Sequence, residues 1–414
     1  MSERLAKRRR VESSSETTGP EVAVFDERTQ LYSIIDPGSW NGFCEIESEP
    51  ALFNVMLREF GVKNVKVQEV VSLDDSMLEL LPKPVYGLIF LFRWREDDPE
   101  KQEAICPDGL WFANQTTPNA CASVALLNIV NNVNDIELGD ELRNFKEFTM
   151  PFTPALRGDA IANFEFIKRI HNSFARNMDI LSADLQLKNE ATAQRKYRSR
   201  KQREEHEEAA FHFIAFVPAL GRIWKFDGLE RQPQNLGSYS GNDWLKFVKP
   251  EIMARMMAYE EDQIEFSVLG LVRDPLVDYV SDLAANIKLI HALRDRLSEL
   301  LSGDAAPSLL REDELLESDA SYNLTQDDID RASIPGDCAA RLRDLGPDEL
   351  LKEYANLREA QRAIRASIKE ELQGRQMDEE YAEGRRHDYT AAVSLWARIL
   401  ARKGVIRELI EEIR

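Results

Sequence analysis

The pattern of apolar residues changes at Pro275 and divides the chain into two unlike parts. Before this proline, short apolar runs typical of buried strands alternate with helical patterns. After it, leucines and isoleucines recur every three or four residues, which predicts helices alone. The 414 residues leave room for two or three domains. We therefore expect an α+β domain at roughly 35–272, followed by an all-α, coiled-coil-like extension.

Patterns typical of strands and of helices alternate within the first part. Val85–Trp94 and Phe211–Val217 are apolar enough to be buried strands. A turn at Pro218–Gly221 follows the second of these, and Ile223–Phe226 returns, which predicts a hairpin. Asn119–Val133 is apolar on nearly all sides, as a buried helix would be. Weaker patterns predict two further strands and an amphipathic helix, at Val65–Val71, Ile264–Val272 and Ala51–Phe60.

The second part is predicted to contain helices joined by an acidic linker. A helical stripe occupies 273–301, and further stripes lie within 339–414. Between them, residues 302–338 carry ten Asp and Glu against two Lys and Arg, which indicates a linker. Two compatible interpretations are open for the helices: an antiparallel hairpin that packs on itself, or a module that docks another protein.

Composition excludes several classes of protein. The net charge of −20 argues against a dedicated nucleic-acid-binding protein. The longest apolar run, Val85–Phe92, is far shorter than the roughly 20 residues that cross a bilayer. The four cysteines are far apart and form no CxxC pair, so we expect neither a disulfide scaffold nor a metal site. No feature of the sequence calls for a cofactor.

The N-terminal residues 1–30 are polar and are expected to be disordered. The basic run Lys7–Arg10 is either a nuclear localisation signal or a solvated charge run. No apolar segment is present here, so we expect no secretory signal. These features predict a protein of the nucleus and cytoplasm.

One cysteine and one histidine stand where chemistry is possible. Cys121 opens the predicted buried helix, and the positive end of a helix dipole stabilises a thiolate. His212 lies on a predicted buried strand, and Asp227 lies at the end of the strand that returns from it. A hairpin can place this aspartate against the imidazole and fix its tautomer. Gln115, six residues before the cysteine, could donate its amide to an oxyanion. Core packing is the competing interpretation for each residue.

Residues 184–210 interrupt the domain just before the strand at Phe211. Six basic residues are followed at once by four glutamates, and no face of this stretch is apolar. A segment of this length inside a compact domain is typical of a functional lid or a disordered loop. A solvated charge block is the simpler interpretation of its charges.

The segment Asn114–Ser123 resembles the active-site segment of the ubiquitin C-terminal hydrolase family, whose members are thiol deubiquitinases. Phe211–Phe213 and Phe226–Leu229 resemble the histidine and aspartate motifs of that family, with matching spacing. Trp40–Val62 is similar to its N-terminal segment, and Arg169–Arg176 also matches. The motifs fall in the family's order and cover roughly 38–272. This resemblance is specific because separated motifs agree.

The C-terminal region narrows the resemblance to one branch of the family. Arg385–Tyr389 is similar to the start of a helical unit in the branch with a C-terminal extension. That branch includes a proteasome-associated hydrolase and a nuclear Polycomb-type histone deubiquitinase. The resemblance implies that residues 339–414 bind an activating adaptor, either a proteasome receptor or a subunit of a chromatin complex. Nucleic acid would then be met only through a nucleosome, and no membrane is implied.

The resemblance also implies a papain-like fold, with a central antiparallel sheet flanked by helices, together with a reaction and residue roles. The expected reaction is hydrolysis of the bond after the C-terminal glycine of ubiquitin, free or conjugated to other proteins. By resemblance, Cys121 is the nucleophile, His212 the general base and acid, Asp227 the orienting carboxylate and Gln115 the oxyanion donor. The tail of ubiquitin is basic, and the acidic residues of the N-terminal segment are candidate contacts for it: Glu45, Glu47 and Glu49. The stretch before His212 corresponds to a loop that crosses the active site.

Two other functions compete with this interpretation. One is a non-catalytic ubiquitin-binding scaffold assembled through the helical C-terminus. The intact set of Gln115, Cys121, His212 and Asp227 argues against it. The other is a different papain-like peptidase or acyl transferase, which the match of the N-terminal segment disfavours.

Overall fold

The computed structural model describes residues 40–94, 97–183, 185, 211–239, 244–257, 266–300, 314–333 and 345–406, together with two short strands near the N-terminus. Those strands, β1 (Ala23–Phe25) and β2 (Tyr32–Ile34), pair antiparallel. Strand β1 lies within residues 1–30, for which the sequence predicts disorder. The basic run 7–10 and most of the insertion 184–210 lie outside the described residues.

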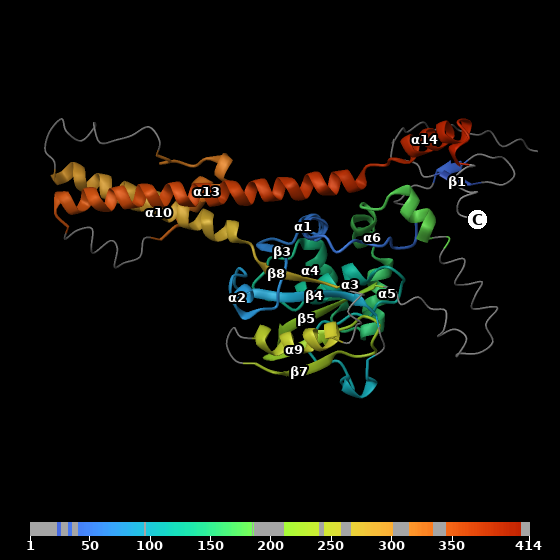
Figure 1. Cartoon of the computed structure of the whole chain (residues 1–414). Coiled ribbons are helices and arrows are strands. Elements are labelled where there is room, and N and C mark those ends of the chain that lie inside the picture. The colour runs from blue at the N-terminus through green and yellow to red at the C-terminus, as the bar shows by residue number, and fades with distance from the viewer. Residues whose placement is uncertain are drawn as a thin grey trace, which may run out of the picture.

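A six-stranded antiparallel sheet forms the centre of the first part (Figure 1). Its strands run in the order β3-β8-β4-β5-β6-β7. Strands β4 and β5 lie at the centre and pair with each other from Leu88–Phe216 to Arg93–Phe211. The α+β class and the antiparallel sheet are therefore confirmed. The strand bounds are β3 Val65–Glu69, β4 Val85–Arg93, β5 Phe211–Ala219, β6 Arg222–Phe226, β7 Gln234–Ser238 and β8 Ser267–Arg273.

Helices cover both faces of this sheet, which explains why its central strands are apolar throughout. Along β4, Phe90 and Phe92 face one core, whereas Ile89 and Leu91 face the other. The first core includes residues of α9, and the second, larger core includes α1 and α3. The helices of this part are α1 Pro50–Glu59, α2 Asp75–Glu79, α3 Cys121–Val130, α4 Asp140–Thr149, α5 Pro154–Asn163, α6 Glu165–Asn172 and α9 Trp244–Met257, with the 3-10 turn η2 at Pro99–Lys101.

Two long helices, α10 (Pro275–Leu300) and α13 (Pro347–Arg386), form the body of the second part. They lie side by side as an antiparallel pair (Figure 1). Ile287 and Ile368 pack in one apolar cluster, and Leu293, Leu350 and Tyr354 pack in a second. The leucine stripe of α10 is thus buried by the chain itself, as the hairpin interpretation requires. A shorter helix, α14 (Thr390–Arg402), follows and has no buried residue.

Part of the predicted acidic linker is folded. Residues 314–333 contain the 3-10 turn η4 (Ala320–Tyr322) and helix α11 (Gln326–Arg331), whose start is fixed by a capping box. Tyr322, Leu324 and Ile329 are buried against α10 and α13. Composition pointed to a linker because acidic residues dominate the segment, but three apolar side chains are enough to pack it.

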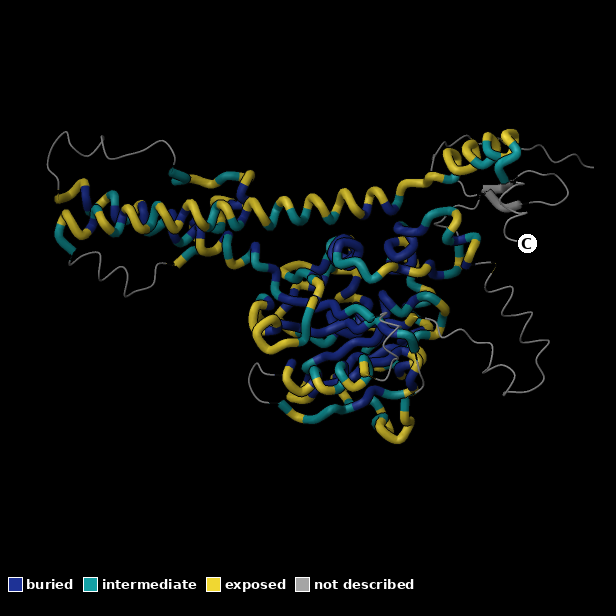
Figure 2. Tube along the Cα trace, in the orientation of Figure 1, coloured by how far each residue is buried: buried dark blue, intermediate teal, exposed yellow. Residues whose placement is uncertain are grey.

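Helix α13 also joins the two parts of the molecule. Its central stretch is largely exposed in Figure 2, but its last turns lie against the first part, where Ala382 enters the larger core. Charged side chains hold this contact: Glu371 pairs with Lys66 at 2.6 Å, and Glu379 pairs with Arg58 at 2.9 Å. Such pairs are individually weak, and their number along one helix makes the contact specific.

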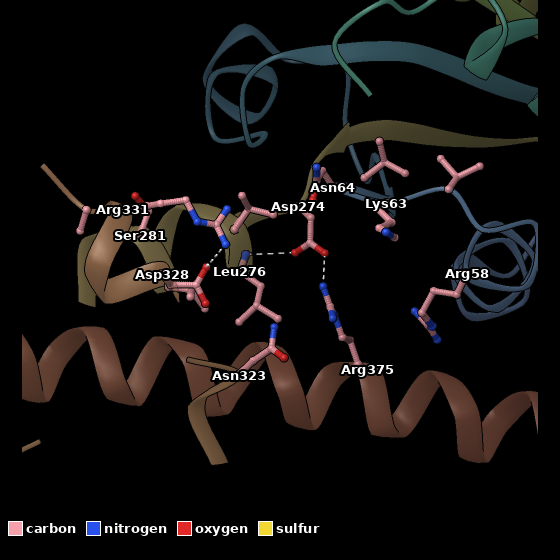
Figure 3. A pocket seen from close by; sticks show the side chains of 15 residues that line it. Arg58, Lys63, Asn64, Asp274, Leu276, Ser281, Asn323, Asp328, Arg331 and Arg375 are labelled. Atoms are coloured by element: carbon pink, nitrogen blue, oxygen red, sulfur yellow. Dashed lines mark hydrogen bonds and ion pairs between the residues drawn. The ribbon is translucent and has the colours of Figure 1, made fainter. Parts of the chain in front are cut away.

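A cavity of about 500 Å³ lies at this junction (Figure 3). It is lined by charged residues of both parts, and Arg375 of α13 pairs there with Asp274, which also accepts from the backbone N–H of Leu276. Arg58 and Arg331 are among the other charged residues that line the cavity. The cavity contains none of the candidate catalytic residues.

Candidate active site

The candidate nucleophile Cys121 is the first residue of α3. Every later residue of this helix is buried, whereas Cys121 itself is half-buried. The preceding Asn119 has a φ of 61°, a left-handed conformation that asparagine tolerates better than most residues. Because the chain turns at Asn119, helix α3 begins directly at Cys121. The thiol therefore lies at the helix N-terminus and at the edge of the core.

The hairpin of β5 and β6 brings His212 and Asp227 together. His212 is the second residue of β5, and Asp227 follows the last residue of β6. The imidazole Nε2 lies 2.7 Å from Asp227 Oδ1, and both side chains are buried. Asp227 Oδ1 also accepts the backbone N–H of Leu229 at 2.9 Å. Both residues predicted from the hairpin are therefore placed side by side.

The Cys121 thiol interacts with the same imidazole. Burial by itself lowers the pKa of His212, but the hydrogen bonds to Asp227 and Cys121 outweigh burial and raise this pKa to about 9. Burial raises the pKa of Asp227, yet His212 and the Leu229 N–H hold it below the usual value for an aspartate. Because Asp227 engages Nε2, Nδ1 is the ring nitrogen available to the thiol. Among the described residues, Asp227 and Cys121 are the titratable groups that act on His212.

Gln115 is held beside both α3 and the turn that carries Asp227. Its backbone N–H donates to the carbonyl of Gly228 at 2.8 Å. A Cβ added at Gly228 would lie 3.0 Å from Gln115 Cβ and 3.3 Å from Val124 of α3, so only glycine fits without a shift. The side-chain oxygen of Gln115 is buried and finds no hydrogen-bond partner within the described part of the chain. The structure therefore places Gln115 between the start of α3, which carries Cys121, and the turn that carries Asp227.

The three candidate substrate carboxylates have different surroundings. Glu45 is exposed and Glu49 is half-buried. Glu47 is engaged by helix α13, because its carboxylate lies 3.1 Å from Arg385 Nε and accepts from the hydroxyl of Tyr381 at 3.3 Å. Arg385 also pairs with Asp179 at 2.6 Å. Local sequence patterns hold no signal for this contact, because it joins segments more than 330 positions apart.

His171, Cys44 and Cys106 lie in surroundings that suit a structural role. His171 is fully buried between Ser123 and the carbonyl of Cys44, and burial lowers its pKa to about 4, so it is neutral at pH 7. Burial raises the pKa of Cys44 to about 12 and also raises that of Cys106. His206 and Cys338 lie outside the described residues. No group of three or more potential metal ligands occurs among the residues that the structure describes.

A buried lysine next to the site was missed by the sequence reasoning. Lys225, two residues before Asp227, is completely buried and pairs with Asp97 and Glu230. The available signal was a single charged residue inside an otherwise apolar returning strand, Ile223–Phe226.

Comparison with known proteins identifies the family of the chain. The sequence pattern of the family described as ubiquitin carboxyl-terminal hydrolase, family 1, matches residues 43–257. The chain belongs to this family. It is therefore a cysteine-type ubiquitin hydrolase with the fold of that family, carrying a helical extension beyond the matched region.

Proteins with similar sequences are also named as ubiquitin carboxyl-terminal hydrolases. Ubiquitin carboxyl-terminal hydrolase isozyme L5 of Dictyostelium discoideum is 36% identical over 63% of this chain and 71% of its own length. Hydrolase ubh-4 of Caenorhabditis elegans is 37% identical over 57% and 68%. BAP1 of Xenopus tropicalis is 33% identical over 58% of this chain but only 35% of its own length. A solved structure of Trichinella spiralis UCH37 bound to ubiquitin vinyl methyl ester is 30% identical, with a TM-score of 0.46 over 59% of this chain and 87% of the other.

None of the helices that the structure describes is both long and apolar enough to cross a bilayer.

Proposed function

We propose that this hydrolase cleaves the bond after the C-terminal glycine of ubiquitin with Cys121, His212 and Asp227 as its catalytic triad. The contact between His212 and Asp227 at 2.7 Å, beside a thiol at the start of α3, is the observation that supports this proposal most. A non-catalytic scaffold would have no need of a buried ion pair aimed at a thiol, because burying charges costs free energy.

The reaction follows from the roles of these groups. The Cys121 thiolate attacks the glycine carbonyl, and the carbonyl oxygen becomes an oxyanion in the tetrahedral intermediate. His212, protonated up to a pH of about 9, gives its proton to the leaving amine, and a thioester forms. His212 then takes a proton from water, which attacks the thioester and releases ubiquitin and the thiolate. Asp227 stabilises the imidazolium that each half of the reaction needs.

Gln115 is proposed as the oxyanion donor, with the backbone N–H of Cys121 as the second donor. Replacing Gln115 by alanine is expected to lower kcat by about 10²–10³, or roughly 3–4 kcal/mol, with little change in KM. Release of a fluorophore from the C-terminus of ubiquitin measures the rate. Gln68→Ala on β3 is the matched control and should retain wild-type kcat. An equal loss in both variants would contradict the role of Gln115.

Helix α14 is proposed as a docking site for an activating adaptor within 339–414. Its apolar side chains are exposed and lie on one side of the helix at spacings of three and four residues: Val393, Leu395, Trp396 and Ile399. A helix whose apolar face is left exposed by the described part of the chain fits a hydrophobic groove on another protein. The proposed adaptor is either a proteasome receptor or a chromatin-complex subunit. A location of the hydrolase in the nucleus and cytoplasm is proposed from the basic run 7–10.

The adaptor proposal predicts a position-specific loss of binding. Trp396→Asp is expected to weaken association with the adaptor at least about tenfold, because large aromatic side chains dominate such interfaces. The native complex is purified, its subunits are identified, and the Kd for the adaptor is then measured with both variants. Ser394→Asp is the control, since it adds the same charge off the apolar face. Basal hydrolysis should be unchanged in both, and equal losses of binding would overturn the proposal.

A further inference from the structure

The ammonium group of Lys225 is buried inside a cluster of charges next to the active site. None of its side chain is exposed, and Nζ lies 2.6 Å from Asp97 Oδ2, 2.8 Å from Glu230 Oε1 and 3.4 Å from Gln234 Oε1. The guanidinium of Arg255 pairs with Asp97 as well. Lys225 and Arg255 therefore face Asp97 and Glu230, and two further charges flank this cluster: Lys101 lies 3.5 Å from Asp97, and Glu251 lies 3.5 Å from Arg255. Burying these charges is costly, and replacing such a cluster by apolar side chains is often neutral for stability. A contribution to stability alone therefore does not explain why this charge cluster is buried.

The Lys225–Glu230 pair brackets the turn that carries Asp227. Lys225 precedes Asp227 by two residues, and Glu230 follows it by three. Inside this bracket, the backbone N–H of Glu230 donates to the carbonyl of Asp227 at 3.1 Å, and the N–H of Leu229 donates to the Asp227 carboxylate at 2.9 Å. The ion pair thus links the two ends of the turn through their side chains. The backbone hydrogen bonds inside the turn orient the Asp227 carboxylate toward His212.

The same turn holds the segment of the proposed oxyanion donor. The side-chain amide of Asn114 donates to the carbonyl of Glu230 at 2.5 Å and to that of Gly228 at 3.4 Å. The backbone N–H of Gln115 donates to Gly228 at 2.8 Å. A displacement of residues 227–230 would therefore move the orienting carboxylate and Gln115 together. A displacement of catalytic groups by about 1 Å can lower the rate of a reaction about 10²-fold.

We propose that Lys225 is a positioning residue for the hydrolysis: its ion pair with Glu230 fixes the turn 227–230, and through this turn it holds Asp227 against His212 and Gln115 beside α3. The inference rests on the catalytic roles proposed above. Lys225 is completely buried, and its charge helps to hold the pKa of the nearby Asp227 below the usual value. Its ion pair with Glu230 acts on the reaction through the geometry of the turn.

The chain offers a matched pair of variants that test this role. Glu230→Gln and Asp97→Asn each neutralise one carboxylate within 3 Å of the same ammonium. Each replaces a carboxylate by an amide of nearly the same volume. Only Glu230 belongs to the turn. Glu230→Gln is expected to lower kcat between about 10-fold and 100-fold with little change in KM. It should also move the alkaline limb of the pH–rate profile to lower pH, because a displaced Asp227 supports the His212 imidazolium less well.

Asp97→Asn is expected to lower kcat far less and to leave the alkaline limb in place. Lys225→Met, which removes the ammonium and keeps an unbranched side chain, should reproduce the effects of Glu230→Gln on both readouts if it folds. Circular dichroism and thermal unfolding of all three variants show whether a loss of rate follows a loss of structure. Glu230→Gln keeps the test open if Lys225→Met is unstable.

Asp227→Asn is measured alongside these variants, so that two failures can be distinguished. If Asp227→Asn retains wild-type activity, the proposed triad itself is wrong. If Asp227→Asn is impaired but Glu230→Gln affects kcat and the alkaline limb no more than Asp97→Asn does, the triad stands and the positioning role of Lys225 is overturned. A larger effect of Glu230→Gln on both readouts supports the proposal.

Discussion

Cys121→Ser is expected to reduce hydrolysis of ubiquitin amides by at least about 10⁴-fold, and to leave ubiquitin binding intact. A serine hydroxyl is far less acidic than a thiol, so neither the helix N-terminus nor His212 can keep it ionised. The substitution changes one atom on a half-buried side chain, so the fold should be preserved. Steady-state rates with a C-terminal ubiquitin fluorophore measure the loss, and calorimetric titration with ubiquitin measures the affinity.

Cys106→Ser is the matched control for this prediction. Cys106 is also half-buried, but burial raises the pKa of its thiol, which suits a structural cysteine. Its serine variant should hydrolyse ubiquitin amides at close to the wild-type rate. Substantial turnover by Cys121→Ser, or a comparable loss in Cys106→Ser, would show that the nucleophile has been misassigned.

Asp227→Asn is expected to lower kcat by up to about 10⁴-fold, on the scale seen when other hydrolases lose this residue. The neutral amide cannot hold the imidazolium, and its NH₂ group favours the wrong tautomer of His212. The 2.7 Å contact with the buried carboxylate is a main reason that the pKa of His212 is raised to about 9. Removing the carboxylate therefore lowers that pKa.

The sign of the accompanying pH effect follows from this shift. In the wild-type enzyme the imidazolium is present below a pH of about 9, and activity is lost as the pH rises through that value. In Asp227→Asn the proton leaves at lower pH, so the alkaline limb of kcat/KM moves toward neutrality. Profiles from about pH 5 to about pH 10 measure the limb. Asp159→Asn, on the exposed side of α5, is the control; an unmoved limb in Asp227→Asn would argue against the proposed pair.

Much of the fold follows from local patterns in the sequence. The apolar runs predicted β4 and β5 because both strands are buried on two faces, and the short turn at 218–221 predicted β6, the hairpin partner of β5. Strand β7 was not predicted, since Gln234–Ser238 is a half-buried edge strand with little apolar character. The folded segment within the acidic linker was missed because a few buried side chains decided its structure.

The candidate site was only partly accessible from the sequence. The His212–Asp227 pair could be predicted because a hairpin brings the ends of its two strands side by side, and both residues lie just beyond the last ladder pair, Ala215–Phe226. Cys121 lies 91 positions before His212, and spacing alone cannot place them together; the family resemblance supplied that link. The contacts of Lys225 with Asp97 and of Glu47 with Arg385 join segments 128 and more than 330 residues apart, so local patterns hold no trace of them.

The most direct test of the catalytic assignment is to map the residue that reacts with ubiquitin carrying a C-terminal electrophile. The adduct is formed with the full-length protein, digested and sequenced by mass spectrometry. Among the four cysteines, Cys121 alone should carry the ubiquitin-derived group, and Cys121→Ser should form no adduct. An adduct on Cys44, Cys106 or Cys338, or labelling that persists in Cys121→Ser, would contradict the account.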